Sequence, residues 1–161
     1  AEPFSSLMLP IPSQKECSIF DCLNEYMKYE ILKDDNKWFN DKTNEYLDVK
    51  KNTIFWNLPK ILIINLIRYS SNNRKIHTLV TSPLVDVSFA NYISGYNPDT
   101  FVYDLFGTSN HSGGTSGGHY TANIKNANGN WYNINDKFIT QIKENDIINQ
   151  HTYCLFYRKK L

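Results

Sequence analysis

The pattern of apolar and polar positions predicts one helix and a strand in the first third of the chain. Residues 4–12 (FSSLMLPIP) alternate apolar and small residues up to two prolines, which favours a strand that ends where proline removes a backbone donor. From Ser18 to Ile31 apolar residues recur at helical spacing behind a serine that can cap the first turn. Residues 33–53 are polar with scattered aromatic rings, and predict short strands and loops.

The densest β-branched run, ILIINLIRY at residues 61–69, predicts a strand buried on both faces at the centre of a sheet. A polar connection is expected over residues 70–82, followed by a strand around Leu84 to Phe89. A loop over residues 91–99 contains glycine and proline, and a further strand is expected from Phe101 to Gly107.

A hairpin signal follows a glycine-serine segment. Residues 108–118 (TSNHSGGTSGG) predict a flexible loop, and loops of this kind on a rigid sheet often carry functional residues. Beyond it, HYTANIK (119–125) and WYNIND (131–136) flank Asn128-Gly129, a dipeptide that favours a tight hairpin turn. Two paired strands are therefore expected here.

The remaining elements complete an α+β prediction. A final strand is expected over residues 151–159 and a second helix near residues 141–149. One or two helices beside five or more strands predict an α+β domain dominated by an antiparallel sheet. The chain has 161 residues, 41% apolar and 20% charged, which is typical of one globular domain and argues against disorder.

Charge, apolar run length and cysteine content exclude several classes of function. A net charge of +1 without a long basic run gives no reason to expect nucleic acid as a partner. The longest apolar run is far shorter than the roughly 20 residues that span a bilayer, so no membrane segment is expected. Three cysteines without framework spacing, in a chain that lacks an apolar leader, indicate a reducing compartment, either cytoplasm or nucleus.

His119 and Asn135 are the candidate catalytic pair, provided that the hairpin has the right register. A two-residue Asn-Gly turn places them on opposite faces of the ribbon, whereas a three-residue loop over 127–129, with a left-handed glycine, places both on one face. A histidine oriented by an amide is the base of a Cys-His-Asn arrangement, in which the imidazolium stabilises a thiolate and later protonates the leaving amine. A purely structural histidine at the start of a strand is the alternative.

Sequence blocks spread over the whole chain carry a family resemblance. In chain order they are FSSLMLPIP, SIFDCLNEYM, LPKILIINLIRY, VYDLFG, GGHYTANIK, NWYNINDKFIT and TYCLFYRK. Together they resemble the ubiquitin-specific proteases, papain-like cysteine peptidases, and within them the C-terminal half of the catalytic domain. The resemblance implies that residues 1–161 form the palm and partial fingers, with the fingers at about 33–57 and the thumb subdomain missing.

The same resemblance implies roles for individual residues of the candidate site. The family hydrolyses the bond after the C-terminal Gly-Gly of ubiquitin, with a histidine base that matches His119. Asn135 matches the residue that orients this base. Asp136 matches an auxiliary acid that could take over the orientation.

Five further residues match the family's substrate channel. Gly117 and Gly118 would let the backbone approach a narrow channel that admits residues without side chains. Tyr120, Arg68 and Tyr69 would line that channel. For Arg68 and Tyr69 the alternative is structural: a snorkelling charge that caps the end of the strand, and a packed ring.

The chain also departs from the family. The segment with the catalytic cysteine has no counterpart, and Cys17, Cys22 and Cys154 are expected to be structural. The nucleophile is therefore expected on a missing cysteine-bearing half, and this chain alone is expected to be inactive. Many relatives have a Cys-x-x-Cys pair where this chain has Asn40 and Thr43, so neither a metal nor any cofactor is expected.

Three hypotheses remain open at this stage. The first is the histidine-bearing half of a thiol-dependent deubiquitinase, with ubiquitin or ubiquitinated proteins and the missing half as partners. The second is a non-catalytic ubiquitin-binding module of the same fold. The third is an unrelated all-β interaction domain, which a large separation of His119 from Asn135 would support.

Overall fold

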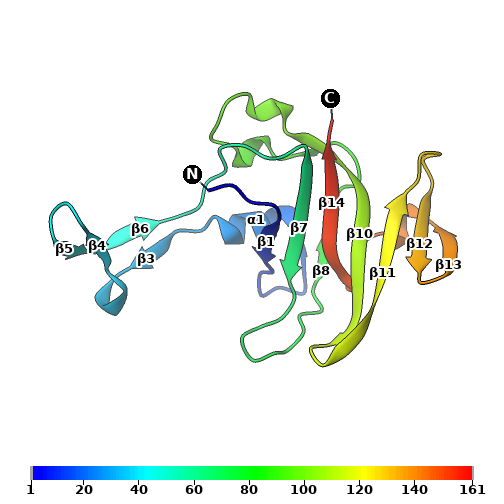
Figure 1. The fold of residues 1–161 in the computed structure, drawn as a ribbon, viewed down its shortest axis with the longest axis horizontal. Helices are drawn as coiled ribbons and strands as arrows, with labels where there is room; N and C mark the ends of the chain where they lie inside the picture. Colours follow the sequence, from blue (N-terminus) through cyan, green and yellow to red (C-terminus); the bar gives the residue numbers. More distant parts are fainter. Residues whose placement is uncertain (1, 161) are drawn as a thin grey trace.

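One mixed sheet organises the computed structural model, which describes residues 2–160 (Figure 1). Its strands in spatial order are β1 (Leu7–Pro10), β7 (Ile61–Ile67), β14 (Thr152–Lys159), β10 (Val102–Gly114), β11 (Gly117–Lys125), β12 (Trp131–Asn135) and β13 (Phe138–Ile142), with the short β9 (Val87–Ser88) beside β10. β1 and β7 are parallel, and the other neighbouring pairs of this sheet are antiparallel. A sheet-dominated α+β fold is therefore confirmed.

Helix α1 (Ile19–Tyr26) begins where the sequence predicts and ends earlier. The Ser18 hydroxyl accepts a hydrogen bond from the backbone N–H of Asp21, whose carboxylate accepts one from the backbone of Ser18, so the two form a capping box. The predicted extension to Ile31 is wrong, because residues 28–31 are exposed and offer no further apolar position to the core. Among the described residues no helix is long and apolar enough to cross a membrane.

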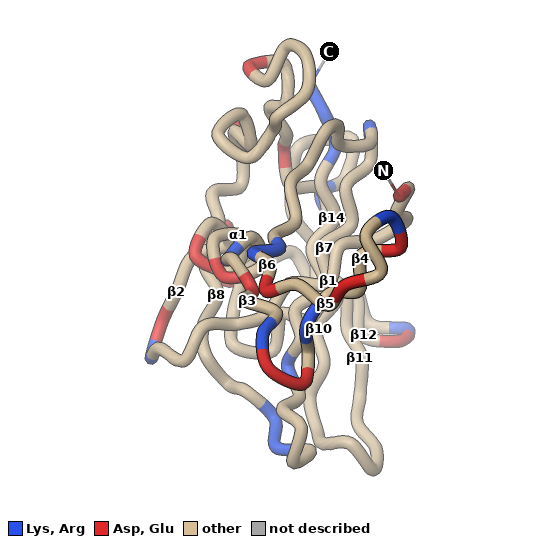
Figure 2. The backbone as a smooth tube through the Cα atoms, turned by 90° about the vertical axis from the view of Figure 1, so that its left-hand side faces the viewer, with Lys and Arg blue, Asp and Glu red and all other residues tan. Residues whose placement is uncertain are grey.

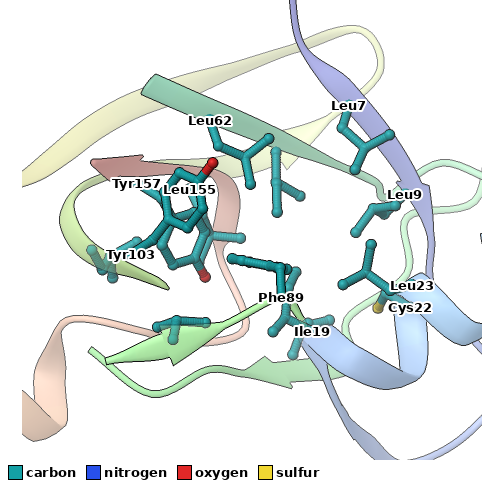
Figure 3. Close-up of a cluster of buried hydrophobic side chains, with 14 of the residues drawn as sticks. Leu7, Leu9, Ile19, Cys22, Leu23, Leu62, Phe89, Tyr103, Leu155 and Tyr157 are labelled. Atoms are coloured by element: carbon teal, nitrogen blue, oxygen red, sulfur yellow. The ribbon is translucent and has the colours of Figure 1, made fainter. Parts of the chain in front are cut away.

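The hydrophobic core lies between α1 and one face of the sheet (Figure 3). Phe89 sits at its centre and packs edge-on against the rings of Tyr103 and Tyr157, with centroid distances of 5.4 and 5.9 Å. Burial of each large apolar side chain here contributes about 1.5–3 kcal/mol. The fully buried members are Leu9, Ile19, Cys22, Leu23, Leu62, Ile64, Leu66, Val80, Val87, Phe89, Tyr103, Leu105, Ile147, Leu155 and Tyr157.

Strand β7 is the second strand of the sheet and is buried on one face, so both parts of its prediction are wrong. Leu62, Ile64 and Leu66 face the core, whereas Ile61 and Ile67 are 41% and 39% exposed. Apolar residues at both odd and even positions of this strand had suggested that other elements cover both faces of the sheet there. Within residues 2–160, α1 covers only the face that carries Leu62, Ile64 and Leu66.

Residues 108–118 form a hairpin in place of the predicted flexible loop. β10 continues to Gly114 and β11 begins at Gly117, and these two glycines pair across a two-residue turn. Pairing of β10 with β14 on its other side extends as far as Asn110. Pairing between β10 and β11 runs along the whole segment, and this outweighs the low strand propensity of glycine and serine.

The second predicted helix, near residues 141–149, is also absent. Its first two residues end β13, and the rest includes only a 3₁₀ turn, η4 (Glu144–Asp146). Ile147 is fully buried and anchors this segment under the sheet. Tertiary packing of one isoleucine therefore decides the local structure, and helical spacing does not.

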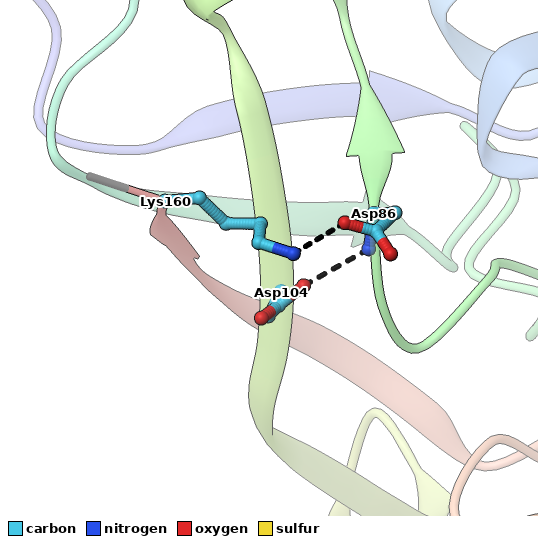
Figure 4. A network of polar contacts seen from close by, with 3 residues as sticks. All are labelled: Asp86, Asp104 and Lys160. Atoms are coloured by element: carbon cyan, nitrogen blue, oxygen red, sulfur yellow. Dashed lines mark hydrogen bonds and ion pairs between the residues drawn. The ribbon is translucent and has the colours of Figure 1, made fainter.

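The connection between β7 and β10 contains more structure at one end than predicted and less at the other. β8 (Leu79–Thr81) pairs in parallel with β2 (Glu16–Ser18) inside the segment expected to be irregular. Of the strand predicted over 84–89, only β9 forms. Asp86 precedes β9 and has a left-handed backbone conformation. Its carboxylate contacts the Lys160 ammonium, and its backbone N–H donates to the Asp104 carboxylate at 2.9 Å (Figure 4). Two 3₁₀ turns, η2 (Ala90–Tyr92) and η3 (Pro98–Thr100), follow.

Residues 30–51 form an arm that projects from the sheet (Figure 1). Its elements are β3 (Glu30–Leu32), η1 (Asp34–Asn36), β4 (Trp38–Asn40), β5 (Glu45–Leu47) and β6 (Val49–Lys51), which confirms short strands and loops. The rings of Phe39 and Tyr46 pack across the β4–β5 hairpin at 5.0 Å. Charges of both signs follow one another along the arm (Figure 2). The ring of Trp56 contacts Tyr96 outside the arm.

Candidate active site

The β11–β12 hairpin has the register that the candidate catalytic pair requires. Ala122 pairs with Ile134, which leaves a three-residue loop over 127–129 whose glycine has a φ of 85°. The predicted bulged hairpin is thus confirmed. Because side chains alternate along a strand, this register turns His119 and Asn135 toward the same face.

His119 and Asn135 are in direct contact. The Nε2 atom of His119 lies 2.6 Å from Oδ1 of Asn135, so the ring N–H at Nε2 donates to the amide oxygen. This bond fixes the tautomer and leaves the Nδ1 lone pair available to a thiol. Oδ2 of Asp136 is 3.9 Å from the same Nε2, too far for a hydrogen bond, and Asp136 occupies a left-handed turn position after β12. Asn135 therefore orients the ring.

A second amide pair supports the hairpin from the same face. Nδ2 of Asn133 donates to Oδ1 of Asn123 at 2.7 Å, and Nδ2 of Asn123 donates to the carbonyl of Ile147 at 2.8 Å. Asn123 is only 2% exposed, so these bonds are protected from water. Sequence reasoning missed this pair, although both asparagines share the parity of His119 and Asn135.

Arg68 is inside the structure, which contradicts its predicted contact with substrate. The side chain is 1% exposed, and burial lowers the pKa of its guanidinium. Nε donates to the carbonyl of Thr152 at 2.5 Å, and Nη1 donates to the carbonyls of Ile76 and Thr78 at 3.0 and 2.9 Å. Arg68 therefore ties the segment after β7 to the start of β14, a structural role in which the charge is buried and does not snorkel to solvent.

A buried histidine that sequence reasoning missed lies behind the candidate substrate residues. His111 is 5% exposed, and its Nδ1 faces the Tyr69 hydroxyl at 3.2 Å and the Lys75 ammonium at 3.1 Å. Its ring lies 4.6 Å from that of Tyr120, its partner in the β10–β11 register. Tyr69 is half-buried against His111, while Tyr120 remains 57% exposed. The sequence could have indicated His111 only through the pairing of β10 with β11, which places it opposite Tyr120. The prediction of a flexible loop over residues 108–118 hid this pairing.

The two candidate glycines differ in what surrounds them. A Cβ at Gly118 would lie 2.3 Å from Nε2 of His111 and 2.4 Å from the carbonyl oxygen of Ser112, so the packing of the chain itself requires glycine there. A Cβ at Gly117 would meet nothing within 4 Å. Gly117 is therefore the more open of the two positions.

Comparison with known proteins decides the family. The model of the ubiquitin carboxyl-terminal hydrolase family matches residues 12–157. The chain belongs to this family. It is 35% identical over 150 residues to ubiquitin carboxyl-terminal hydrolase 9 of Arabidopsis thaliana, covering 91% of this chain and 16% of that protein. It is 30% identical over 164 residues to ubiquitin carboxyl-terminal hydrolase 4 of Pongo abelii, covering 99% of this chain and 17% of that protein.

Solved structures share the fold of this chain. The SAGA DUB module of Ubp8, Sgf11, Sus1 and Sgf73 bound to monoubiquitin contains a chain that matches with a TM-score of 0.84 at 29% identity, over 99% of this chain and 36% of that one. The same module bound to ubiquitin aldehyde matches with a TM-score of 0.81 at 27% identity, over 98% of this chain and 36% of that one. This chain thus spans about a sixth of the curated relatives and about a third of the solved ones. The hypothesis of an unrelated all-β domain is excluded.

All three cysteines of the chain are buried and free of disulfide bonds. Burial raises the pKa of the Cys154 thiol to about 11, and it raises the pKa of Cys17 and Cys22 as well. The thiolate form is therefore suppressed at each site, which fits the structural role expected for them. Within residues 2–160, no three His, Cys, Asp or Glu side chains gather as a metal site.

Removal of the Arg68 guanidinium should destabilise the fold. Arg68→Met keeps much of the apolar stem but leaves the carbonyls of Ile76, Thr78 and Thr152 without their donor. We expect the free energy of unfolding, measured by denaturant titration, to fall by roughly 3 kcal/mol. Arg74→Met, at an exposed position in the same segment, serves as the control and should change it by less than about 0.5 kcal/mol. Equal, small losses in both variants would contradict this role of Arg68.

His111 should make stability fall in acid. Burial lowers its pKa below the ordinary value of 6.5, and the charges of Lys75 and His151 lower it further. The unfolded chain therefore takes up this proton first, so the contribution of His111 to stability is complete above pH 6.5 and is lost as pH falls through the folded pKa. The titratable groups that face the ring are Tyr69, Lys75, Tyr120, Tyr153 and His151.

The matching experiment measures the free energy of unfolding against pH below 6.5. His111→Gln should flatten this dependence relative to the unsubstituted chain, because glutamine does not titrate. His77→Gln, at an exposed position, should leave the slope as it is. A His111→Gln slope as steep as that of the unsubstituted chain shows that His111 does not bind the proton differently in the two states.

Proposed function

We propose that this chain supplies the histidine and the amide of a thiol-dependent deubiquitinase that hydrolyses the bond after the C-terminal Gly-Gly of ubiquitin. The observation that carries the proposal is the 2.6 Å contact of His119 Nε2 with Asn135 Oδ1, in a member of the ubiquitin carboxyl-terminal hydrolase family. The SAGA DUB module, whose chain shares this fold, has been solved bound to monoubiquitin and to ubiquitin aldehyde, which supports ubiquitin as the partner.

The chemistry follows from the tautomer of His119. Its Nε2–H is held by Asn135, so Nδ1 accepts the proton of a cysteine thiol and the ion pair of imidazolium and thiolate forms. The thiolate attacks the carbonyl carbon of the terminal glycine, and the C–N bond breaks as the imidazolium protonates the leaving amine. Nδ1 then takes a proton from water, whose hydroxide cleaves the thioester and releases the carboxylate of ubiquitin and the thiol.

The nucleophile belongs, on this proposal, to a cysteine-bearing half beyond the 161 residues. Cys17, Cys22 and Cys154 are buried, and burial raises the pKa of each thiol, so none of them suits the task. This chain alone is then inactive. A requirement for reduced thiols also fits a cytoplasmic or nuclear protein.

The substrate contacts are assigned by exposure. Gly117 is open to an approaching backbone and Tyr120 presents a half-exposed ring, so these two would contact the C-terminal tail of ubiquitin. Tyr69 would act through His111, whose Nδ1 lies 3.2 Å from the Tyr69 hydroxyl oxygen. On the plan of the family, the sheet corresponds to the palm and residues 33–57 to partial fingers.

A non-catalytic ubiquitin-binding module is the second candidate. The burial of all three cysteines favours it, because it leaves this chain with the base and without a nucleophile. It predicts binding of ubiquitin with no turnover, whichever cysteine-bearing segment is added. The deubiquitinase predicts turnover once the missing half is present.

Reconstitution distinguishes the two. The chain is mixed or fused with a cysteine-bearing half of the family, and the hydrolysis of a fluorogenic C-terminal amide of ubiquitin is followed. His119→Ala should reduce kcat/KM by about 10²–10⁴-fold, because the base and acid are lost. Asn135→Ala should also reduce it, while Asn135→Asp should keep most of it, since a carboxylate oxygen accepts the same ring N–H.

His77→Ala is the matched control, as it removes an exposed histidine and should leave the rate unchanged. A ubiquitin probe with a C-terminal electrophile should label the reconstituted protein and leave this chain alone unlabelled. Full activity in His119→Ala would overturn the proposed catalysis. Binding of ubiquitin without turnover in every reconstitution would establish the binding module.

A further inference from the structure

Lys75 joins two segments that are distant in sequence. It lies in the connection after β7, and its Nζ is 2.6 Å from the carbonyl oxygen of His111, 3.0 Å from that of Gly113 and 3.1 Å from Nδ1 of His111. An ammonium has three N–H donors, so these three acceptors satisfy all of them. Burial lowers the pKa of Lys75, and no carboxylate of the described chain lies within ion-pair distance of it. The hydrogen-bond donors of Lys75 are thus all directed to residues 111–113 of β10.

The end of β10 has little else to hold it in place. Gly113 and Gly114 pair with Gly118 and Gly117, so the tip of the hairpin has no side chains at these four positions. The backbones are also close together, since a Cβ at Gly113 would lie 2.6 Å from the carbonyl oxygen of Gly117. A ribbon of glycines is flexible unless other groups fix it. Lys75 provides such a contact from outside the hairpin.

Lys75 is itself anchored to the interior. It forms an isolated antiparallel bridge with Tyr69, and the N–H of the next residue, Ile76, donates to the carbonyl of Arg68 at 2.7 Å. The guanidinium of Arg68 in turn donates to the carbonyl of Ile76. A continuous series of bonds therefore runs from the buried Arg68 through Lys75 to the carbonyl of Gly113.

We propose that Lys75 is a positioning residue that clamps the glycine tip, residues 113–118, against the segment after β7. The clamp sets the place of Gly117, and the contact of Lys75 with His111 sets that of Tyr120 through ring packing. Its effect on substrate rests on the proposed function, in which Gly117 and Tyr120 contact the tail of ubiquitin. The contact of Lys75 with the glycine tip is independent of the proposed function.

Amide hydrogen exchange of this chain alone tests the clamp. Lys75→Met keeps the aliphatic stem and removes the ammonium, and it should speed exchange at residues 112–118 by about tenfold while residues 103–109 stay unchanged. Lys75→Arg, which retains donors, should restore part of the protection. Lys42→Met, an exposed lysine of the arm, is the control and should have no effect at the tip. Unchanged exchange at 112–118 in a folded Lys75→Met chain overturns the clamp.

Kinetics of the reconstituted enzyme test its consequence. Lys75→Met should raise KM for the ubiquitin substrate several-fold with kcat nearly unchanged, because His119 and Asn135 point from the opposite face of β11. Lys75→Arg should recover part of the affinity. A fall in kcat at constant KM would show that Lys75 acts on the base and not on the tip. If no reconstitution is active, the proposed function fails while the exchange result still decides the clamp.

Discussion

The hydrogen bond from His119 to Asn135 depends on one residue of hairpin register. With the three-residue loop over 127–129, His119 and Asn135 share a face and their side chains meet at 2.6 Å. A two-residue turn would send one of them to the other face, because side chains alternate along a strand. The left-handed glycine of this loop therefore decides whether His119 and Asn135 meet, although it lies far along the hairpin from both.

Buried polar groups carry out the positioning around this bond. Asn123 and Asn133 hold the two strands together beneath His119, and Arg68 fixes the segment from which Lys75 reaches the hairpin tip. His111 fills the space that a side chain at Gly118 would need. Such groups stabilise a single arrangement because each has partners that no other conformation supplies. The hydrogen bond between His119 and Asn135 is exposed, whereas Arg68, His111 and Asn123, which support its surroundings, are buried.

The sequence predicted local features well and long-range ones poorly. Three predictions are confirmed: the Ser18 cap of α1, the bulged hairpin and the family. A cap, a turn and short sequence blocks can each be recognised from residues that are neighbours in the sequence. The strand over 108–114 and the one-sided burial of β7 depend on which strands lie alongside, and glycine composition or β-branched density does not report that. Arg68 was misassigned for the same reason, since the carbonyls that surround it come from two separate segments, residues 76–78 and Thr152. The catalytic and substrate roles stay predictions.

The most direct test of the central claim is nitrogen NMR of the His119 ring in this chain at a pH where the ring is neutral. The account predicts that the proton resides on Nε2, and that Asn135→Ala shifts the ring to a mixture of the two tautomers while Asn133→Ala leaves it closer to the original state. A proton on Nδ1 in the unsubstituted chain, or a tautomer ratio indifferent to Asn135, would contradict it.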